Sequence, residues 1–132
     1  MNDTDRDLLA QKARGVLRNF RGRSDAVLSC GLVTFDGLVI ASELAAEVDP
    51  DRFGAMCAAL LALSSRASKE VARGQLRQVI LDGEHGPMLL HRAGNVGVLA
   101  VAAGPSAKLG KLILDAREAS RALAELYGEH LA

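Results

Sequence analysis

The chain has 132 residues, of which 49% are hydrophobic and 24% are charged, so it is long and apolar enough to bury the core of one domain. Lysine plus arginine equals aspartate plus glutamate, at 16 each, which excludes the strong positive charge of a general nucleic-acid binder. Aromatic residues make up only 3%, so the chain also lacks the rings on which single-stranded nucleic acid stacks. We therefore expect a single domain over residues 1–132 that binds no nucleic acid.

The first predicted helix covers residues 4–20, where apolar side chains from Leu9 to Phe20 recur at the spacing of one helix face. Two strands follow, at residues 26–34 and 38–43, and both are short apolar runs. The first of these strands is apolar on both faces, so we expect it to be covered on both sides.

Asp36 and Gly37 lie between these two strands. An Asp-Gly pair is typical of a two-residue hairpin turn because both residues tolerate positive φ. The same Asp36 could instead be a catalytic or metal-binding carboxylate. It has no neighbouring His, Cys or second carboxylate to complete such a site, so the turn is the interpretation that we favour.

The second predicted helix covers residues 50–73, with Asp49 as its N-cap, Pro50 at its first position and Gly74 as its C-terminal cap. The side chains expected to face the sheet are Phe53, Met56, Cys57, Leu60, Ser64, Ala67 and Val71. The opposite side carries Ala55, Ala58, Ala59 and Ala62, and then Arg66, Lys69 and Arg73. The first three turns of this helix therefore carry almost no charge on either side, unlike an ordinary surface helix.

A helix of this kind needs cover on both sides, and small side chains let another helix approach closely. We expect its outer side to be a protein–protein surface, formed most simply between two copies of this chain. The alternative is that the alanines are only good helix formers that remain in contact with water.

Three further strands are predicted at residues 76–82, 87–93 and 96–102, and their short connections allow only antiparallel hairpins. The last of them is apolar on both faces and should be central, whereas strand 76–82 has the polar residues of an edge strand. We predict that two copies pair through this edge and the outer side of the second helix, using Ala55, Ala58, Ala59, Ala62, Arg77, Val79 and Leu81. A final helix at about residues 106–127 is predicted to start with Ser106 as its N-cap.

Residues with catalytic or ligand-binding chemistry are few. His85 lies in a predicted turn and His91 on a predicted strand, and neither has a partner at metal-ligand spacing. The segment GPSAKLGK leads from a strand into a helix but lacks the GK[ST] sequence of a phosphate-binding loop. The sequence therefore predicts no catalytic residue, no metal and no cofactor, and a protein that is not an enzyme.

The cellular setting is indicated by the first residues and by the cysteines. MNDTDRD is acidic and precedes no apolar segment of the kind found in a signal peptide, and no apolar run approaches the roughly 20 residues of a membrane span. Cys30 and Cys57 lie in apolar runs, which is typical of reduced, buried thiols. We expect a cytoplasmic protein that does not insert into membranes.

Four stretches, in this order, resemble the Roadblock family of dynein light-chain-like proteins over about residues 5–127. They are FDGLVIAS, the helix 50–73, GPMLLHRAGNVGVLAVAA and AKLGKLILDAREASRALAEL. The resemblance implies a three-layer α/β/α fold of the α+β class, with a five-stranded antiparallel sheet in the order 2-1-5-4-3. It places the middle helix on one face and the two terminal helices on the other, and it implies dimers formed through the middle helix and the third strand.

Prokaryotic members of the family, such as the gliding-motility regulators, are partners of small Ras-like GTPases. The resemblance therefore implies a homodimeric, non-enzymatic regulator or scaffold for such a GTPase, with stimulation of GTP hydrolysis as a further activity. It supplies no catalytic side chain, but Arg52, Arg66, Lys69 and Arg73 are candidates for the GTPase contact, the alternative being a solvated helix face. A small-ligand sensor, a structural scaffold without GTPase contact, and a thiol or metal enzyme are the alternative functions.

Overall fold

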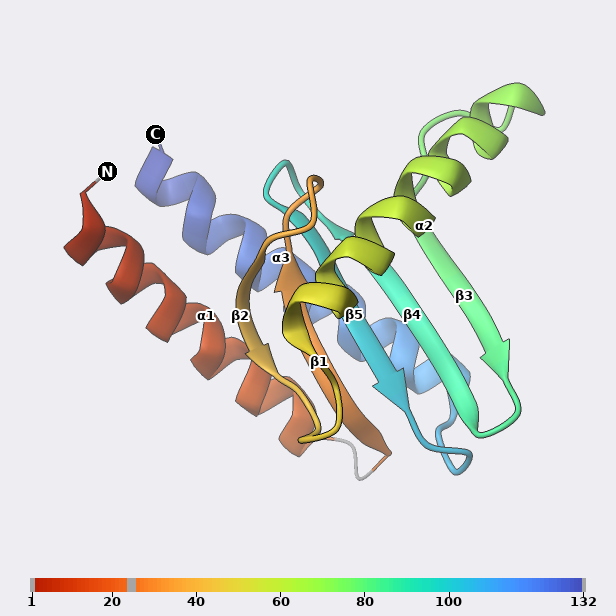
Figure 1. The fold of residues 1–132 in the computed structure, drawn as a ribbon, viewed down its shortest axis with the longest axis horizontal. Coiled ribbons are helices and arrows are strands. Elements are labelled where there is room, and N and C mark those ends of the chain that lie inside the picture. Colours follow the sequence, from red (N-terminus) through yellow and green to blue (C-terminus); the bar gives the residue numbers. More distant parts are fainter. Residues whose placement is uncertain (1, 24–25, 132) are drawn as a thin grey trace.

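The computed structural model describes residues 2–23 and 26–131, and the side chains up to residue 128. The elements in chain order are α1 (Asp3–Gly22), β1 (Val27–Val33), β2 (Val39–Glu43), α2 (Pro50–Glu70), β3 (Gln78–Gly83), β4 (Gly86–Ala93), β5 (Gly97–Ala103) and α3 (Leu109–Leu131). The strands form one antiparallel sheet in the order β2-β1-β5-β4-β3 (Figure 1). The predicted fold class, element order and strand order are confirmed.

The sheet is covered on both faces, with α1 and α3 on one side and α2 on the other (Figure 1). The larger core cluster includes Leu17 of α1, Leu123 of α3 and Leu99 of β5. The smaller one includes Phe53 of α2 and Val98 of β5. Neighbouring residues of β5 thus enter opposite clusters, as alternation along a strand requires. The prediction that this strand is central is confirmed.

The start of α2 was predicted correctly, but its end was not. Asp49 caps its start, with Oδ1 accepting a hydrogen bond from the backbone N–H of Asp51 at 3.2 Å, and Pro50 is its first residue. The predicted cap Gly74 is wrong. The helix ends at Glu70, and Ala72 takes the positive φ of 59° that usually falls to glycine.

Backbone hydrogen bonds explain this early end of α2. The N–H of Arg73 donates to the carbonyl of Ser68 at 2.7 Å, and that of Ala72 donates to the carbonyl of Lys69 at 3.0 Å. These two bonds form a Schellman motif, which satisfies the last carbonyls of the helix and requires a left-handed residue at position 72. Gly74 has a second positive φ of 83° in the loop beyond.

The start of α3 also differs from the prediction. The helix begins at Leu109, so Ser106 is not its N-cap. Ser106 lies in a turn that the N–H of Ala107 closes by donating to the carbonyl of Gly104 at 3.1 Å. Pro105 follows that glycine and favours the turn because its φ is fixed near the value required.

The side of α2 that faces the sheet was only partly predicted. Phe53 and Cys57 are buried, but Met56 is 57% exposed and Val71 is 64% exposed, and Ala67 is exposed as well. Met56 precedes the buried Cys57 by one residue and so points about 100° away from it around the helix. Ala67 is in the last turn of α2 and Val71 is its C-cap, and this end of the helix projects beyond the sheet (Figure 1).

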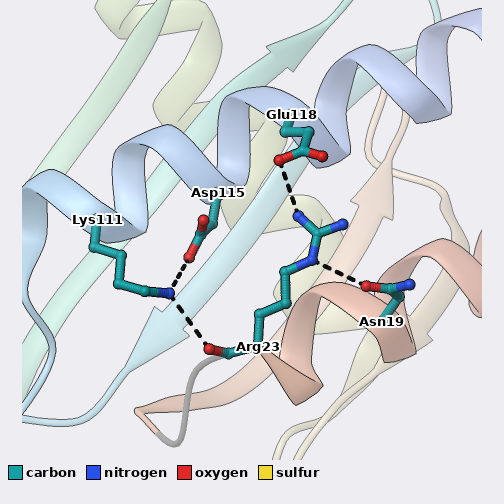
Figure 2. A network of polar contacts seen from close by, with 5 residues as sticks. All are labelled: Asn19, Arg23, Lys111, Asp115 and Glu118. Atoms are coloured by element: carbon teal, nitrogen blue, oxygen red, sulfur yellow. Dashed lines mark hydrogen bonds and ion pairs between the residues drawn. The ribbon is translucent and has the colours of Figure 1, made fainter.

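A network of polar contacts joins the end of α1 to α3 (Figure 2). The guanidinium of Arg23 lies 3.1 Å from Glu118 and donates to Asn19 at 3.0 Å. Lys111 donates to the backbone carbonyl of Arg23 at 3.3 Å and contacts Asp115 at 2.6 Å. These groups are mostly exposed, and exposed pairs contribute about 0–1 kcal/mol each, so the network orients the two helices more than it stabilises the fold.

The edge strand β2 is short and lies beside α1. Its last residue, Glu43, forms an ion pair with Arg18 of α1, with 3.7 Å between Nε and Oε1. The other edge of the sheet is β3, which pairs only with β4 among the described strands.

Candidate interaction surface

The first turn of α2 carries the exposed charged residues Asp51 and Arg52, but residues 53–65 carry no charge. Over that uncharged part the exposed residues, on the outer side of the helix, are Ala55, Met56, Ala59, Ala62 and Leu63, and Leu63 is 64% exposed. Three of these five are alanines that the sequence placed on this side, whereas the sequence did not assign Met56 and Leu63 to it. The apolar area open to solvent is therefore larger than the alanines alone would give.

Ala58, which the sequence placed with the other alanines, is half-buried and lies against the β1–β2 hairpin. A Cβ atom at Gly37 would lie 3.4 Å from the Cβ of Ala58, which is ordinary van der Waals contact. Ala58 is thus directed toward its own hairpin rather than toward solvent.

The edge strand β3 continues this exposed surface. Val79 is half-buried and packs in the same cluster as Leu60 and Leu61 of α2. Leu81 lies two residues further along, so its side chain is on the same face of the sheet, where it is 42% exposed. Arg77 is exposed and precedes the strand. The outer side of α2 and this face of β3 are called the α2–β3 surface below.

The four basic side chains proposed for a GTPase contact, Arg52, Arg66, Lys69 and Arg73, are all exposed. They do not form one cluster. Arg52 is in the first turn of α2, whereas the other three lie in its last turns and in the loop that follows, at least about 20 Å away at 1.5 Å of rise per residue. No carboxylate of the described residues forms an ion pair with any of them.

The β1–β2 connection is longer than the predicted two-residue turn. Residues 34–38 lie between the strands, and only Gly37 among them has positive φ, at 98°. Asp36 accepts a hydrogen bond from the hydroxyl of Thr34, and that hydroxyl accepts one from the N–H of Leu38 at 3.0 Å. Asp36 therefore holds the connection in shape, in agreement with its interpretation as a turn residue.

The two cysteines are structural residues, and the two candidate histidines lie apart from them. Cys30 and Cys57 are buried free thiols on opposite faces of the sheet, and burial raises the pKa of Cys30 to about 12 and that of Cys57 to about 11. A thiol with such a pKa is not a nucleophile at neutral pH. His85 is exposed in the β3–β4 hairpin, and His91 is half-buried on β4.

Two other kinds of site are absent from residues 2–23 and 26–131. Among the described side chains, which end at residue 128, no three His, Cys, Asp or Glu residues lie close enough together to hold a metal ion. Nor does any helix there have the length and hydropathy needed to span a bilayer.

Comparison with known proteins places the chain in a family. Residues 9–103 match the family model of the Roadblock/LC7 domain. The uncharacterized protein MJ0714 of Methanocaldococcus jannaschii is 37% identical over 98 residues, which is 74% of this chain and 82% of that protein.

Solved structures share the fold at lower identity. "MglB with tetrameric arrangement" is 22% identical, with a TM-score of 0.82, over 92% of this chain and 91% of that one. The gliding protein MglB of Thermus thermophilus is 23% identical, with a TM-score of 0.81, over 92% of each chain. The family model matches residues 9–103, and the order of the helices and strands is the one that the family resemblance implied. The chain therefore belongs to the Roadblock/LC7 domain family.

Proposed function

We propose that the protein is a homodimeric regulator or scaffold that binds a small Ras-like GTPase and has no catalytic residue of its own. The observation that carries this proposal is the α2–β3 surface, an exposed apolar helix face beside an open sheet edge. Membership of the Roadblock/LC7 domain family supports it, as does the likeness in fold to a gliding protein.

The α2–β3 surface suits a second copy of the same chain because both of its parts can pair with themselves. An open edge strand has unpaired backbone groups, and antiparallel pairing of β3 with β3 would satisfy them and extend the sheet. Burying Met56, Leu63 and Leu81 would then remove three exposed apolar side chains from water, each worth about 1.5–3 kcal/mol when fully buried.

The charges along β3 favour this antiparallel arrangement. Arg77 precedes the strand, whereas Asp82 and Glu84 lie at its other end. A two-fold axis through the middle of β3 brings the basic end of one copy to the acidic end of the other. Parallel pairing would instead place like charges together. Charge complementarity of this kind selects orientation more than it adds affinity.

The GTPase would contact the part of α2 that projects beyond the sheet. Arg66, Lys69 and Arg73 are exposed there and have no ion-pair partner among the described residues, so they can meet an acidic surface and speed association. Holding the switch segments of the GTPase in place would assist hydrolysis without a catalytic group from this chain.

Two measurements test the proposal in order. Light scattering after size exclusion should give the mass of a dimer. Binding to the cognate small GTPase is then measured with GDP and with a non-hydrolysable GTP analogue, and single-turnover GTP hydrolysis is followed with and without the protein. A dimer that binds neither nucleotide state would leave a structural scaffold as the function, and a chain that is monomeric at high concentration would contradict the dimer itself.

A further inference from the structure

A pocket of about 490 Å³ lies where the start of β3, the end of β4 and the middle of α3 meet. The polar side chains that line it are those of Gln75, Arg77, Gln78, His91, Arg92 and Arg117. They come from three separate parts of the chain, which the β3–β4 pairing and the passage of α3 bring together: Gln78 is the register partner of His91. Its volume lies within the roughly 300–1,000 Å³ of typical small-molecule sites.

The pocket is basic, and none of its lining side chains is acidic. Three of its lining residues are arginines, and no carboxylate of the described residues forms an ion pair with them. Other basic residues of the same region are paired: Figure 2 shows Lys111 with Asp115 and Arg23 with Glu118. Arg117 directly precedes Glu118 on α3 but lines the pocket instead of joining that network.

The three arginines do not have equal freedom. Arg92 donates from Nε to the carbonyl of Gly94 at 3.0 Å, and its guanidinium lies 5.1 Å from the ring centre of Phe35. These contacts hold the guanidinium of Arg92 in place as part of the pocket wall, so it is not free to move toward a ligand. Arg77 and Arg117 are exposed, and their guanidinium groups make no such contact within the described part of the chain. Both are available to a ligand in a single copy, and Arg117 stays available in the proposed dimer.

His91 and Gln78 supply the remaining polar groups. The Nδ1 atom of His91 lies 3.0 Å from the carbonyl of Arg92, so Nδ1 carries the proton and Nε2 is left for another partner. Oε1 of Gln78 is buried and has no hydrogen-bond partner among the residues that the structure describes. Burial lowers the pKa of His91, the bond to the Arg92 carbonyl raises it, and the charge of Arg117 lowers it further.

We propose that this pocket binds a phosphate-bearing small molecule through Arg77, His91 and Arg117. The planar guanidinium group donates two parallel hydrogen bonds to a phosphate, and such charge-assisted bonds are stronger than neutral ones. A bound anion would oppose the effect of Arg117 and raise the pKa of His91, so that binding takes up a proton.

The site is separate from the proposed GTPase contact, but Arg77 belongs both to it and to the proposed dimer edge. Arg117 does not, because it lies on α3, on the other face of the sheet from α2. A substitution of Arg117 therefore tests the pocket without disturbing the α2–β3 surface. Arg121, one turn further along α3, is exposed and does not line the pocket, which makes it the matched control.

Titration calorimetry of the full chain with inorganic pyrophosphate tests the proposal. Arg117→Gln should weaken binding by about tenfold or more, the effect of losing a hydrogen bond to a charged group, whereas Arg121→Gln should leave it within about twofold. Light scattering on both variants should show the oligomeric state of the parent, so that failure here and failure of the dimer are distinguishable. No binding of pyrophosphate, equal loss in both variants, or tighter binding of citrate than of pyrophosphate would overturn it.

A second measurement concerns His91. Sulfate keeps its charge between about pH 6 and pH 8, so any pH dependence of its binding comes from the protein, and binding should be tighter at the lower pH because protonated His91 then donates from Nε2. The charged side chains that line the pocket with His91 are Arg77, Arg92 and Arg117, and Nδ1 of His91 is hydrogen-bonded to the Arg92 carbonyl. His91→Gln should remove the pH dependence, and an unchanged dependence in that variant would rule out the role given to His91.

Discussion

Gly54 of α2 lies directly against the backbone carbonyl of Gly37 in the β1–β2 connection. A Cβ atom at position 54 would overlap the Gly37 oxygen and would lie 3.2 Å from a methyl group of Val39. The helix can therefore rest on the connection only because Gly54 has no side chain there. This contact fixes the height of α2 above the sheet, and with it the position of the α2–β3 surface.

Gly54→Ala should destabilise the fold by about 1–3 kcal/mol, because the added methyl group meets backbone atoms that cannot move aside cheaply. Gly15→Ala is the control: it is in the middle of α1, where a Cβ atom meets nothing within 4 Å, and it should stabilise the protein by about 0.5–1 kcal/mol. Urea unfolding curves measure both. Equal midpoints for Gly54→Ala and the parent would show that the contact is not tight.

Ala59→Glu should convert the proposed dimer to monomer, since the new carboxylate would be buried without a partner where two copies meet. Ala59 is exposed in the single chain, so the substitution leaves the fold itself intact. Gln11→Glu adds the same charge to the exposed side of α1 and should leave the dimer unchanged. Light scattering across a range of concentrations gives the masses, and a dimer that survives Ala59→Glu would locate the interface elsewhere.

Replacing Arg66 and Lys69 together by alanine should slow association with a small GTPase and reduce the dependence of the association rate on salt. The rate of dissociation should change less, since exposed charges steer encounter more than they hold the complex. Biosensor kinetics at two salt concentrations measure both rates, with Arg121→Ala as the control on α3. Identical salt dependence in the double variant would show that this end of α2 is only a solvated helix face.

The two buried thiols should react with a disulfide reagent at about pH 8 only after unfolding. Burial raises the pKa of Cys30 to about 12 and that of Cys57 to about 11 from an ordinary value of 9.0, so the native state keeps both protons that the unfolded state releases above that value. Stability from these groups is thus present below pH 9.0 and is lost as pH rises toward about 12. Rapid labelling of the native protein would contradict the burial of both cysteines.

The strands and their hairpins could be anticipated because alternation and turn residues act along short stretches of sequence. The order of the strands was anticipated only through the family resemblance. The phase of α2 could not be fixed as well, since Met56 and Phe53 are both apolar and only packing decides which one faces the sheet. The end of α2 escaped prediction because Ala72, not a glycine, takes the left-handed conformation. The basic pocket was missed because Arg77, His91 and Arg117 are far apart in sequence and become neighbours only through the β3–β4 register and the path of α3.

The two edges of the sheet are unlike each other, and this difference sets a limit on growth. If two copies associate through β3, the joined sheet has a β2 strand at each of its outer edges. This strand has five residues, and its last residue, Glu43, forms an ion pair with Arg18. Short, charged margins of this kind resist the addition of another chain. The joined sheet would then stop growing at two copies of the five-stranded sheet and would not lengthen into a fibre. Any larger assembly must therefore form through contacts between helices.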